Sequence, residues 1–414
     1  MKLSFKYNPK LNDKTLAIIE ELSFHTTKLY NTANYDSREN EFKSYVNMNS
    51  EYSDNWHKQY LHSHNYQHCL KVLEKNWKSY FASIKDYNKN PTKYKGVPQK
   101  PKFKNSKNKN EIIFTNLAIR VKENKLMLSL SKTMQSKFRV KSLNFNLSNK
   151  IKSLVNLDKI QQIKIKWDGV LKSWSLIMIY EKEFENINLG NNTMSIDLGL
   201  DNLATICFSD NKESYIINGK TIKSKNSYLN KEIARLQSIR MKQVGSTKFK
   251  NTNKIIKLRR YREDYINDYM HKASRQILDI ALENNVSKIV IGDIKDIKQN
   301  SKIKSFVQIP IQNLVNVITY KAELLGMELV KQNEAYTSGV SAFDLEEVSK
   351  EFYDKSRRIE RGLFKTNKGL KVNADVNGSL NILRKHLQDK CIPKLIESAR
   401  DNGLVNCPLR IRVA

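Results

Sequence analysis

Cysteine pairs, glycine and proline are scarce in this chain of 414 residues. None of its four cysteines (Cys69, Cys207, Cys391 and Cys407) stands in a C-x-x-C pair, which argues against a zinc ribbon and a disulfide framework. With 13 glycines and seven prolines, the chain is neither collagenous nor of low complexity. No stretch approaches the roughly 18 consecutive apolar residues of a membrane span. Isolated thiols suit a reducing compartment, so we expect a cytoplasmic protein without a membrane partner.

Acidic residues are also in deficit. Asp and Glu number 42 against 73 Lys and Arg, which leaves a formal net charge of +31. Such an imbalance repels itself in a compact chain unless a partner neutralises it. Apolar residues make up 39% of the chain, enough for a buried core, so the charge does not reflect a disordered polymer. We expect a polyanionic partner, and we favour nucleic acid over an anionic membrane surface.

The densest basic segment is a linker of residues 88–110, which contains no acid. Its prolines keep the backbone extended. Tyr94 and Phe103 interleave with its lysines, a combination that suits nucleic acid, with lysines on phosphates and rings on bases or sugars. The alternative is a solvated tether. The candidate contacts are Lys95, Lys100, Lys102 and Lys104.

Hydrophobic periodicity predicts the secondary structure of the whole chain. In order, it predicts a strand over 1–7, helices over 11–42 and 56–84, hairpins over 119–128 and 163–180, strands over 193–198, 203–209 and 213–218, helices over 228–243 and 253–283, a strand over 288–291, a helix over 311–325, a strand over 328–331 and a helix that opens near Asp375. The helix over 253–283 carries Arg259 and Arg260, two further candidates for nucleic-acid contacts.

From residue 193 onward, three strands are followed by alternating helices and strands. This order is typical of a ribonuclease H-like α/β domain, in which the first three strands are antiparallel and the later ones join parallel to the first. Nucleases of this fold hold two Mg²⁺ ions about 3.5–4 Å apart between acidic side chains. Asp197 ends the first of these strands and Asp375 opens the last helix. The simpler interpretations are a hairpin-turn residue for Asp197 and a first-turn acid favoured by the helix dipole for Asp375.

Two motifs resemble a known family. Asp197-Leu198-Gly199-Leu200 and Asn373-Ala374-Asp375-Val376-Asn377-Gly378 resemble the first and third RuvC motifs of TnpB proteins, the transposon-encoded RNA-guided DNA nucleases related to type V CRISPR effectors. The resemblance covers nearly the whole chain. Further segments typical of the family are residues 94–96, 101–104, 271–275, 306–310, 320–322 and 334–338.

The sequence departs from the commonest family pattern twice. Gly292 stands where the second motif usually has a Glu, and residues 335–372 lack the cysteines that usually bind zinc. A branch of the family shares both departures, and the resemblance implies that Glu334 supplies the missing acid there.

Strand geometry allows Glu334 and Asp293 to be compared as the third acid. Side chains alternate along a strand, so Asp293 should point away from the face of position 292. Glu334 follows the next parallel strand, with its Cα roughly 10 Å from that of Asp197, and it is long enough to lean inward over Gly292. We favour Glu334. Asp293 remains the alternative, and a third possibility is that neither acid serves and the protein cannot cut.

The resemblance implies a multidomain α/β protein. It has a ribonuclease H-like RuvC nuclease domain and a β-barrel-like wedge domain with an inserted helical recognition domain. The implied boundaries are 1–10 and 106–185 for the wedge domain, 11–105 for the recognition domain with its basic linker, 190–334 and 372–414 for the nuclease domain with the C-terminal tail, and 335–371 for a small Cys-free insert. Arg357, Arg358 and Arg361 in that insert are expected to guide single-stranded DNA.

The implied function is RNA-guided endonuclease activity beside a short adjacent DNA motif, with Mg²⁺ or Mn²⁺ bound by Asp197, Glu334 and Asp375 and with no zinc. The implied partners are a guide RNA from the transposon end and double-stranded target DNA, in a monomeric ribonucleoprotein of a prokaryotic cytoplasm. Two alternatives remain: a nuclease-dead RNA-guided repressor of the same family, and a transposase or resolvase of this fold that needs no RNA.

Overall fold

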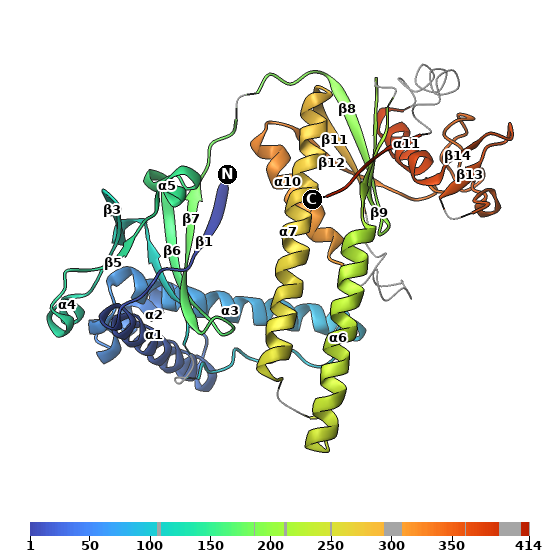
Figure 1. The fold of residues 1–414 in the computed structure, drawn as a ribbon. Helices are drawn as coiled ribbons and strands as arrows, with labels where there is room; N and C mark the ends of the chain where they lie inside the picture. Colours follow the sequence, from blue (N-terminus) through green and yellow to red (C-terminus); the bar gives the residue numbers. More distant parts are fainter. Residues whose placement is uncertain are drawn as a thin grey trace. The chain divides into compact units, whose positions relative to one another are not determined.

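The structure is a computed structural model that describes residues 1–105, 109–185, 187–210, 213–248, 251–293, 309–360, 362–388 and 407–413. The chain forms two compact units, Met1–Glu183 and Phe184–Ala414 (Figure 1). Each unit has its own hydrophobic core, so each is described by itself.

The first unit contains two antiparallel sheets. The larger has the order β1-β7-β6-β2 and the smaller the order β3-β4-β5. The strands are β1 (Lys2–Tyr7), β2 (Ile112–Thr115), β3 (Ile119–Lys122), β4 (Lys125–Ser129), β5 (Ser142–Asn146), β6 (Ile160–Asp168) and β7 (Ser173–Glu181). The N-terminal strand pairs with β7, as the sequence suggested. The expected barrel-like β-domain is thus built from two sheets, because β3 and β4 pair with β5 instead of extending the larger sheet.

Helices α1 (Asp13–Glu39) and α3 (Ser63–Lys89) dominate the rest of this unit, with α2 (Tyr45–Glu51), α4 (Lys132–Phe138) and α5 (Asn149–Leu154) as shorter elements. The Asn12 side chain caps α1 by accepting a hydrogen bond from the Thr15 N–H. Helix α3 begins at Ser63, later than predicted. Residues Trp56–Tyr60 form a separate 3₁₀ turn, and the His62 side chain caps α3.

The second unit is built on a mixed six-stranded sheet of order β12-β11-β8-β9-β10-β15. Its strands are β8 (Asn192–Leu198), β9 (Asn202–Phe208), β10 (Tyr215–Asn218), β11 (Val286–Asp293), β12 (Glu328–Asn333) and β15 (Leu409–Ile411). Strands β8, β9 and β10 are antiparallel, whereas β11 is parallel to β8 and β12 is parallel to β11. The predicted strand directions are therefore confirmed.

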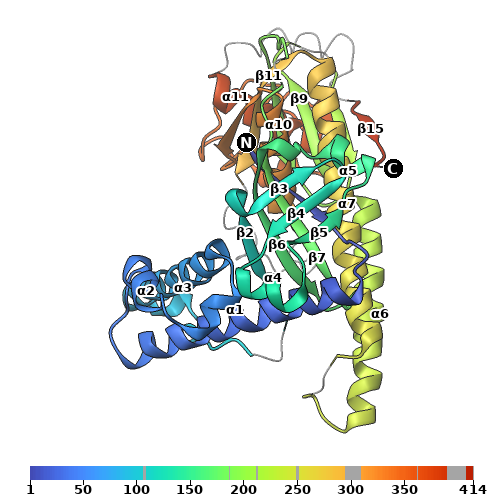
Figure 2. The same ribbon diagram turned by 90° about the vertical axis from the view of Figure 1, so that its left-hand side faces the viewer.

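Helices cover both faces of this sheet. They are α6 (Lys220–Val244), α7 (Asn253–Glu283), α10 (Ile311–Leu324) and α11 (Ala374–Leu387). Ile196 and Ile291 pack into one core with α7 and α10. On the opposite face, the Ser379 hydroxyl of α11 lies 2.9 Å from the Ser195 hydroxyl of β8. Helices α6 and α7 run side by side in both views (Figures 1 and 2). Because residues alternate along β8, Asp197 shares the face of Ser195, which is covered by α11.

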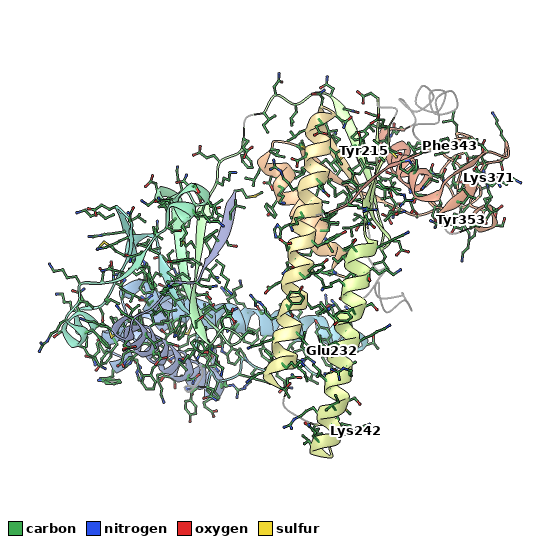
Figure 3. All side chains as sticks on the ribbon, in the orientation of Figure 1. Tyr215, Glu232, Lys242, Phe343, Tyr353 and Lys371 are labelled. Atoms are coloured by element: carbon green, nitrogen blue, oxygen red, sulfur yellow. The ribbon has the colours of Figure 1, made fainter. Side chains whose placement is uncertain are left out.

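Residues 335–373 form the insert between β12 and α11. It contains the 3₁₀ turn η5 (Lys355–Arg357) and the hairpin of β13 (Leu363–Lys365) and β14 (Lys371–Asn373). Phe343, Phe364 and Val372 of the insert share a small core with residues of β9 and α11. Figure 3 shows the side chains of both units and labels Phe343, Tyr353 and Lys371 in this insert.

Among the described residues, no helix combines the length and the apolarity that crossing a membrane requires. Cys69 and Cys207 are buried and unpaired, and Cys407 is exposed and unpaired. Cys391 lies outside the described residues.

Candidate active site at the carboxyl ends of the central strands

Asp197 lies near the end of β8, directly under helix α11. A Cβ atom added to Gly378 would stand 2.7 Å from the Asp197 Oδ2 atom. Real Cβ atoms essentially never come this close to another heavy atom, so a larger residue at position 378 would force the Asp197 carboxylate to shift. The two motifs singled out in the sequence, around Asp197 and Asp375, therefore meet in space.

Glu334 fills the space above Gly292. A Cβ atom at Gly292 would lie 2.5 Å from the Glu334 Cδ atom and 2.7 Å from its Cγ atom. Gly292 pairs with Gln332 of β12, and the preceding Ile291 pairs with Ile196 of β8. Gly292 therefore stands level with Asp197, and the Glu334 carboxyl group reaches in from the neighbouring strand. This placement agrees with the geometry argued from the sequence.

Asp375 occupies the first turn of α11, where the Asn373 side chain caps the helix by accepting from the Asp375 N–H (3.0 Å). Both oxygens of its carboxylate accept hydrogen bonds. Asn202 Nδ2 donates to Oδ2 at 2.6 Å, and Arg358 Nη2 donates to Oδ1 at 2.9 Å. The Asn202 contact was not predicted. Its only sequence signal is an amide directly after the turn at Gly199.

The carboxyl groups repel one another in a poorly solvated place. The pKa of Asp197 is raised well above its usual range by burial and by the charges of Glu334 and Asp375, with Arg358 acting in the opposite direction. Burial and the charge of Asp293 raise the pKa of Glu334 to about 7. The Glu334 Oε1 atom is buried without a hydrogen-bond partner among the described residues. Raised pKa values of this kind arise where several acids share a site that has too little positive charge to balance them.

These features fit a hard divalent cation, because the available donors are carboxylate oxygens and one of them is orphaned. Within the part of the chain that the structure describes, no three His, Cys, Asp or Glu side chains stand at metal-binding spacing. Asp197, Glu334 and Asp375 are a cluster whose charges interact, and the Asp375 carboxylate is paired with Arg358.

Alternation along β11 puts Asp293 on the face opposite to that of position 292. It follows Gly292 by one residue and shares the alternation of Ile291, which belongs to the core with α7 and α10. Its charge still contributes to the raised pKa of Glu334. Asp293 therefore neighbours the cluster from the opposite face.

The predicted nucleic-acid contacts have different surroundings. Lys95, Lys100, Lys102 and Arg259 are exposed, and Lys104 is partly buried. Arg260 forms an ion pair with Asp264 at 3.0 Å. Arg361 lies outside the described residues.

Arg357 requires a correction, because its guanidinium group is engaged inside the insert. It donates to both oxygens of Glu346 (2.9 and 2.7 Å), pairs with Asp344 at 3.3 Å and stacks on Phe364. Its side chain is 11% exposed. A buried arginine bound to two carboxylates holds the insert together and does not fit a role in guiding DNA.

Comparisons with known proteins agree with this architecture. Residues 177–298 match the family model OrfB_IS605, described as a probable transposase, and residues 312–382 match the Cas12f1-like TNB domain. The TnpB-like protein ORF457 of Acidianus two-tailed virus is 29% identical over 206 residues, which are 47% of this chain and 42% of that protein. The match thus spans less than half of that relative.

A solved structure has the same fold over most of its length. It is a cryo-EM structure of a Cas12f1–sgRNA–target DNA complex, with a TM-score of 0.63 and 15% sequence identity. The match covers 88% of this chain and 82% of that one.

Proposed function

We propose that this chain, which belongs to the TnpB family, is an RNA-guided DNA endonuclease of a transposable element. One observation carries the proposal. The acids Asp197, Glu334 and Asp375 come from three elements distant in sequence and interact at one edge of the sheet. The raised pKa values of Asp197 and Glu334 and the orphaned oxygen of Glu334 are expected of a site built to receive cations. The fold shared with a Cas12f1–sgRNA–target DNA complex supports the choice of partners, a guide RNA and a DNA target.

The three acids share one role in this proposal. Asp197, Glu334 and Asp375 would hold one or two Mg²⁺ or Mn²⁺ ions. When bound, such ions supply an activated water and stabilise the leaving oxygen of a phosphodiester. Asn202 positions Asp375 by donating to its Oδ2 atom. Glu334 must give up its proton to act as a ligand, which its pKa of about 7 allows near neutral pH.

Arg358 would act on both the acids and the DNA. In the protein alone it neutralises part of the charge of Asp375 and lowers the pKa of Asp197. Its side chain is 40% exposed, so a phosphate of an approaching strand can reach it. Exchange of a carboxylate for a phosphate would free an oxygen of Asp375 at the moment when DNA arrives.

Recognition of the target is assigned to base pairing, with the protein reading a short adjacent duplex motif and the shape of the heteroduplex. The high net charge favours a structured RNA as a permanent partner. Residues 1–185 would serve as wedge and recognition domains, and residues 335–371 would contact the target strand.

The competing function is RNA-guided repression without cutting. The absence of a closed ligand set among the described residues is the observation in its favour. The deciding experiment is to purify the protein from cells that express the transposon end, sequence the RNA that copurifies, and offer the complex a DNA library matching that guide, with Mg²⁺ present. Cutting that Asp197→Ala abolishes supports the nuclease. Guided binding without cutting supports the repressor, and cutting without any RNA contradicts both.

A further inference from the structure

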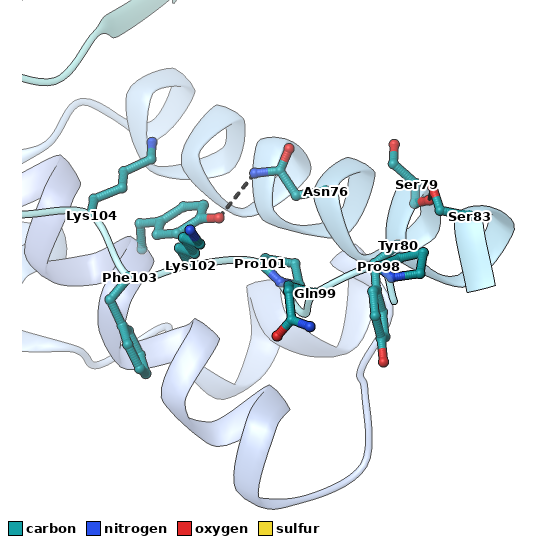
Figure 4. A pocket seen from close by; sticks show the side chains of 11 residues that line it. Asn76, Ser79, Tyr80, Ser83, Pro98, Gln99, Pro101, Lys102, Phe103 and Lys104 are labelled. Carbon is teal, nitrogen blue, oxygen red and sulfur yellow. Dashed lines mark hydrogen bonds between the residues drawn. The ribbon is translucent and has the colours of Figure 1, made fainter. Parts of the chain in front are cut away.

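The first unit contains a pocket of about 560 Å³ between α1, α3 and residues 98–104 (Figure 4). We call residues 98–104 the strap. The volume lies within the roughly 300–1,000 Å³ range of small-molecule and cofactor sites. The pocket lies far along the sequence from the acids of the candidate active site, in the other compact unit.

The strap is fastened to α1 by two asparagines one turn apart. Asn31 donates to the Lys104 carbonyl oxygen (2.7 Å) and accepts from the Lys104 N–H (2.8 Å). Asn34 donates to the Pro101 carbonyl oxygen (3.0 Å). With its backbone bound at Pro101 and Lys104, the strap is a preformed wall of the pocket.

The lining of the pocket combines flat rings, amides, hydroxyls and cations, and none of its residues is Asp or Glu. Figure 4 shows Phe103 and Tyr80 pointing to the same side at opposite ends of the strap, with Gln99 between them. Lys104 lies over the Tyr30 ring, with its Nζ atom 4.2 Å from the ring centroid. The residues on the α3 side are Asn76, Ser79, Tyr80 and Ser83.

The polar groups of the lining are oriented by hydrogen bonds within the protein. Asn76 Nδ2 donates to the Tyr30 hydroxyl (2.9 Å), which fixes its amide plane and directs the carbonyl oxygen away from Tyr30. The hydroxyls of Ser79 and Ser83 donate to backbone carbonyls one turn earlier, both at 2.8 Å, so their oxygens remain acceptors. Phe103 is 47% exposed, with the Arg38 guanidinium group 5.1 Å from its ring centroid.

We infer that this pocket binds the base of an unpaired nucleotide in a single strand, with the neighbouring phosphates on Lys102 and Lys104. Rings supply stacking, fixed amide and hydroxyl oxygens accept from base N–H groups, and lysines neutralise phosphates. A simple anion would leave the rings and amides unused. A duplex cannot enter, because its bases are stacked and present only their edges.

The inference deepens the proposed function, on which it rests for its nucleic-acid partner. It is tested with the full-length protein and single-stranded RNA or DNA of about 12 nucleotides. The oligonucleotides carry 5-iodouracil at one position at a time, for crosslinking and peptide mapping. We expect crosslinks in peptides that contain Tyr80 or Phe103, and weak competition by a matched duplex.

Matched variants separate the pocket from general electrostatics. Phe103→Ala should weaken binding of the single strand about 5- to 150-fold, the range for loss of one stacked base. Tyr35→Ala removes an aromatic side chain of α1 that is 57% exposed and lies outside the pocket, and it should change affinity less than about twofold. Lys102→Ala should cost more affinity than Lys95→Ala, although both remove one exposed charge. Equal melting temperatures establish that the variants are folded.

The pocket is refuted if Phe103→Ala and Tyr35→Ala bind alike, if the crosslinks map elsewhere, or if the duplex competes equally. These outcomes do not depend on cutting. If the protein cannot cut but still crosslinks at Phe103, the pocket proposal stands and the nuclease proposal fails. If the Phe103→Ala variant cuts normally and no crosslinks map to the pocket, the nuclease proposal stands and the pocket proposal fails.

Discussion

The Glu334 carboxyl group occupies the volume that a side chain at Gly292 would need. The two residues belong to neighbouring parallel strand ends, and the backbone of Gly292 does not require glycine for its own conformation, since its φ is not positive. The glycine is therefore explained by what lies above it. An acid at either position would reach the same place beside Asp197.

An exchange of the two residues should be tolerated. Glu334→Ala should reduce cutting by at least about 100-fold, since a charged ligand is removed from the site. Adding Gly292→Glu to that variant should restore part of the activity, because the new carboxylate enters the vacated space. Gly292→Ala alone should also impair cutting, by displacing Glu334. Guided cleavage of a labelled target measures all three. No rescue in a folded double variant would contradict the shared location.

Asp293 and Glu334 should differ in their importance for cutting. Glu334→Gln keeps the shape of the side chain and removes its charge, so cleavage should be lost while RNA-guided DNA binding stays intact. Asp293→Asn should leave substantial activity, because Asp293 belongs to the opposite face of its strand. Parallel cleavage and gel-shift assays compare the variants. The reverse ranking would place the third acid in β11 and overturn the strand argument.

Metal affinity should rise with pH through the neutral range. The pKa of Glu334 is raised from about 4.5 to about 7, so below pH 7 a proton competes with the cation. Apparent Mn²⁺ affinity, measured by calorimetry, should fall up to about tenfold per pH unit below 7. The Glu334→Gln variant should bind more weakly and should lose the part of the pH dependence that Glu334 causes.

The same shift predicts how stability without metal depends on pH. A carboxyl group whose folded pKa exceeds its unfolded value binds more protons when folded, so stability falls as pH rises from about 4.5 to 7. In the presence of a chelator, Glu334→Gln should melt higher than the parent at pH 8, and the difference should shrink at pH 5. Equal melting temperatures at both values would show that Glu334 is not strained by burial and repulsion.

The neighbours Arg357 and Arg358 should have opposite phenotypes. Arg357→Ala leaves the buried carboxylates of Asp344 and Glu346 uncompensated and should destabilise the insert by about 3–5 kcal/mol. Arg358→Ala breaks a more exposed pair, so stability should change by less than about 1 kcal/mol while cleavage falls. Denaturant melts and cleavage assays on both variants test the contrast. A loss of stability in Arg358→Ala as large as that in Arg357→Ala would contradict it.

Periodicity predicted most helices and strands, because their apolar faces are regular and their ends carry ordinary caps. Several short elements were missed, and two boundary errors arose where elements abut. The 3₁₀ turn at Trp56–Tyr60 continues an apolar pattern into α3, and α6 begins at Lys220 because Ile222 is buried nearly two turns before the predicted start. Neither boundary has a local signal strong enough to separate it.

For the candidate site, the sequence identified the residues that lie at chain landmarks and missed those defined by tertiary contacts. A strand end and a helix start pointed to Asp197 and Asp375, and the family resemblance pointed to Glu334. The amide of Asn202 acquires its role only by facing Asp375 across the fold. Arg357 and Arg358 are adjacent in sequence and equal in chemistry, and only packing makes one internal and the other accessible. Sequence alone cannot separate such a pair.

The insert is spliced into the protein between two of the proposed ligands. Glu334 directly precedes it and Asp375 lies two residues after the end of its last strand, β14, whereas Asp197 belongs to β8 of the sheet. The insert therefore connects two of the proposed ligands, Glu334 and Asp375, whereas the third, Asp197, is held by the sheet. A force on the insert, such as that of a nucleic-acid strand bound to its surface, would act on Glu334 and Asp375 together. The distances between the three carboxylates, and with them the affinity for a cation, would then depend on whether a strand is bound to the insert.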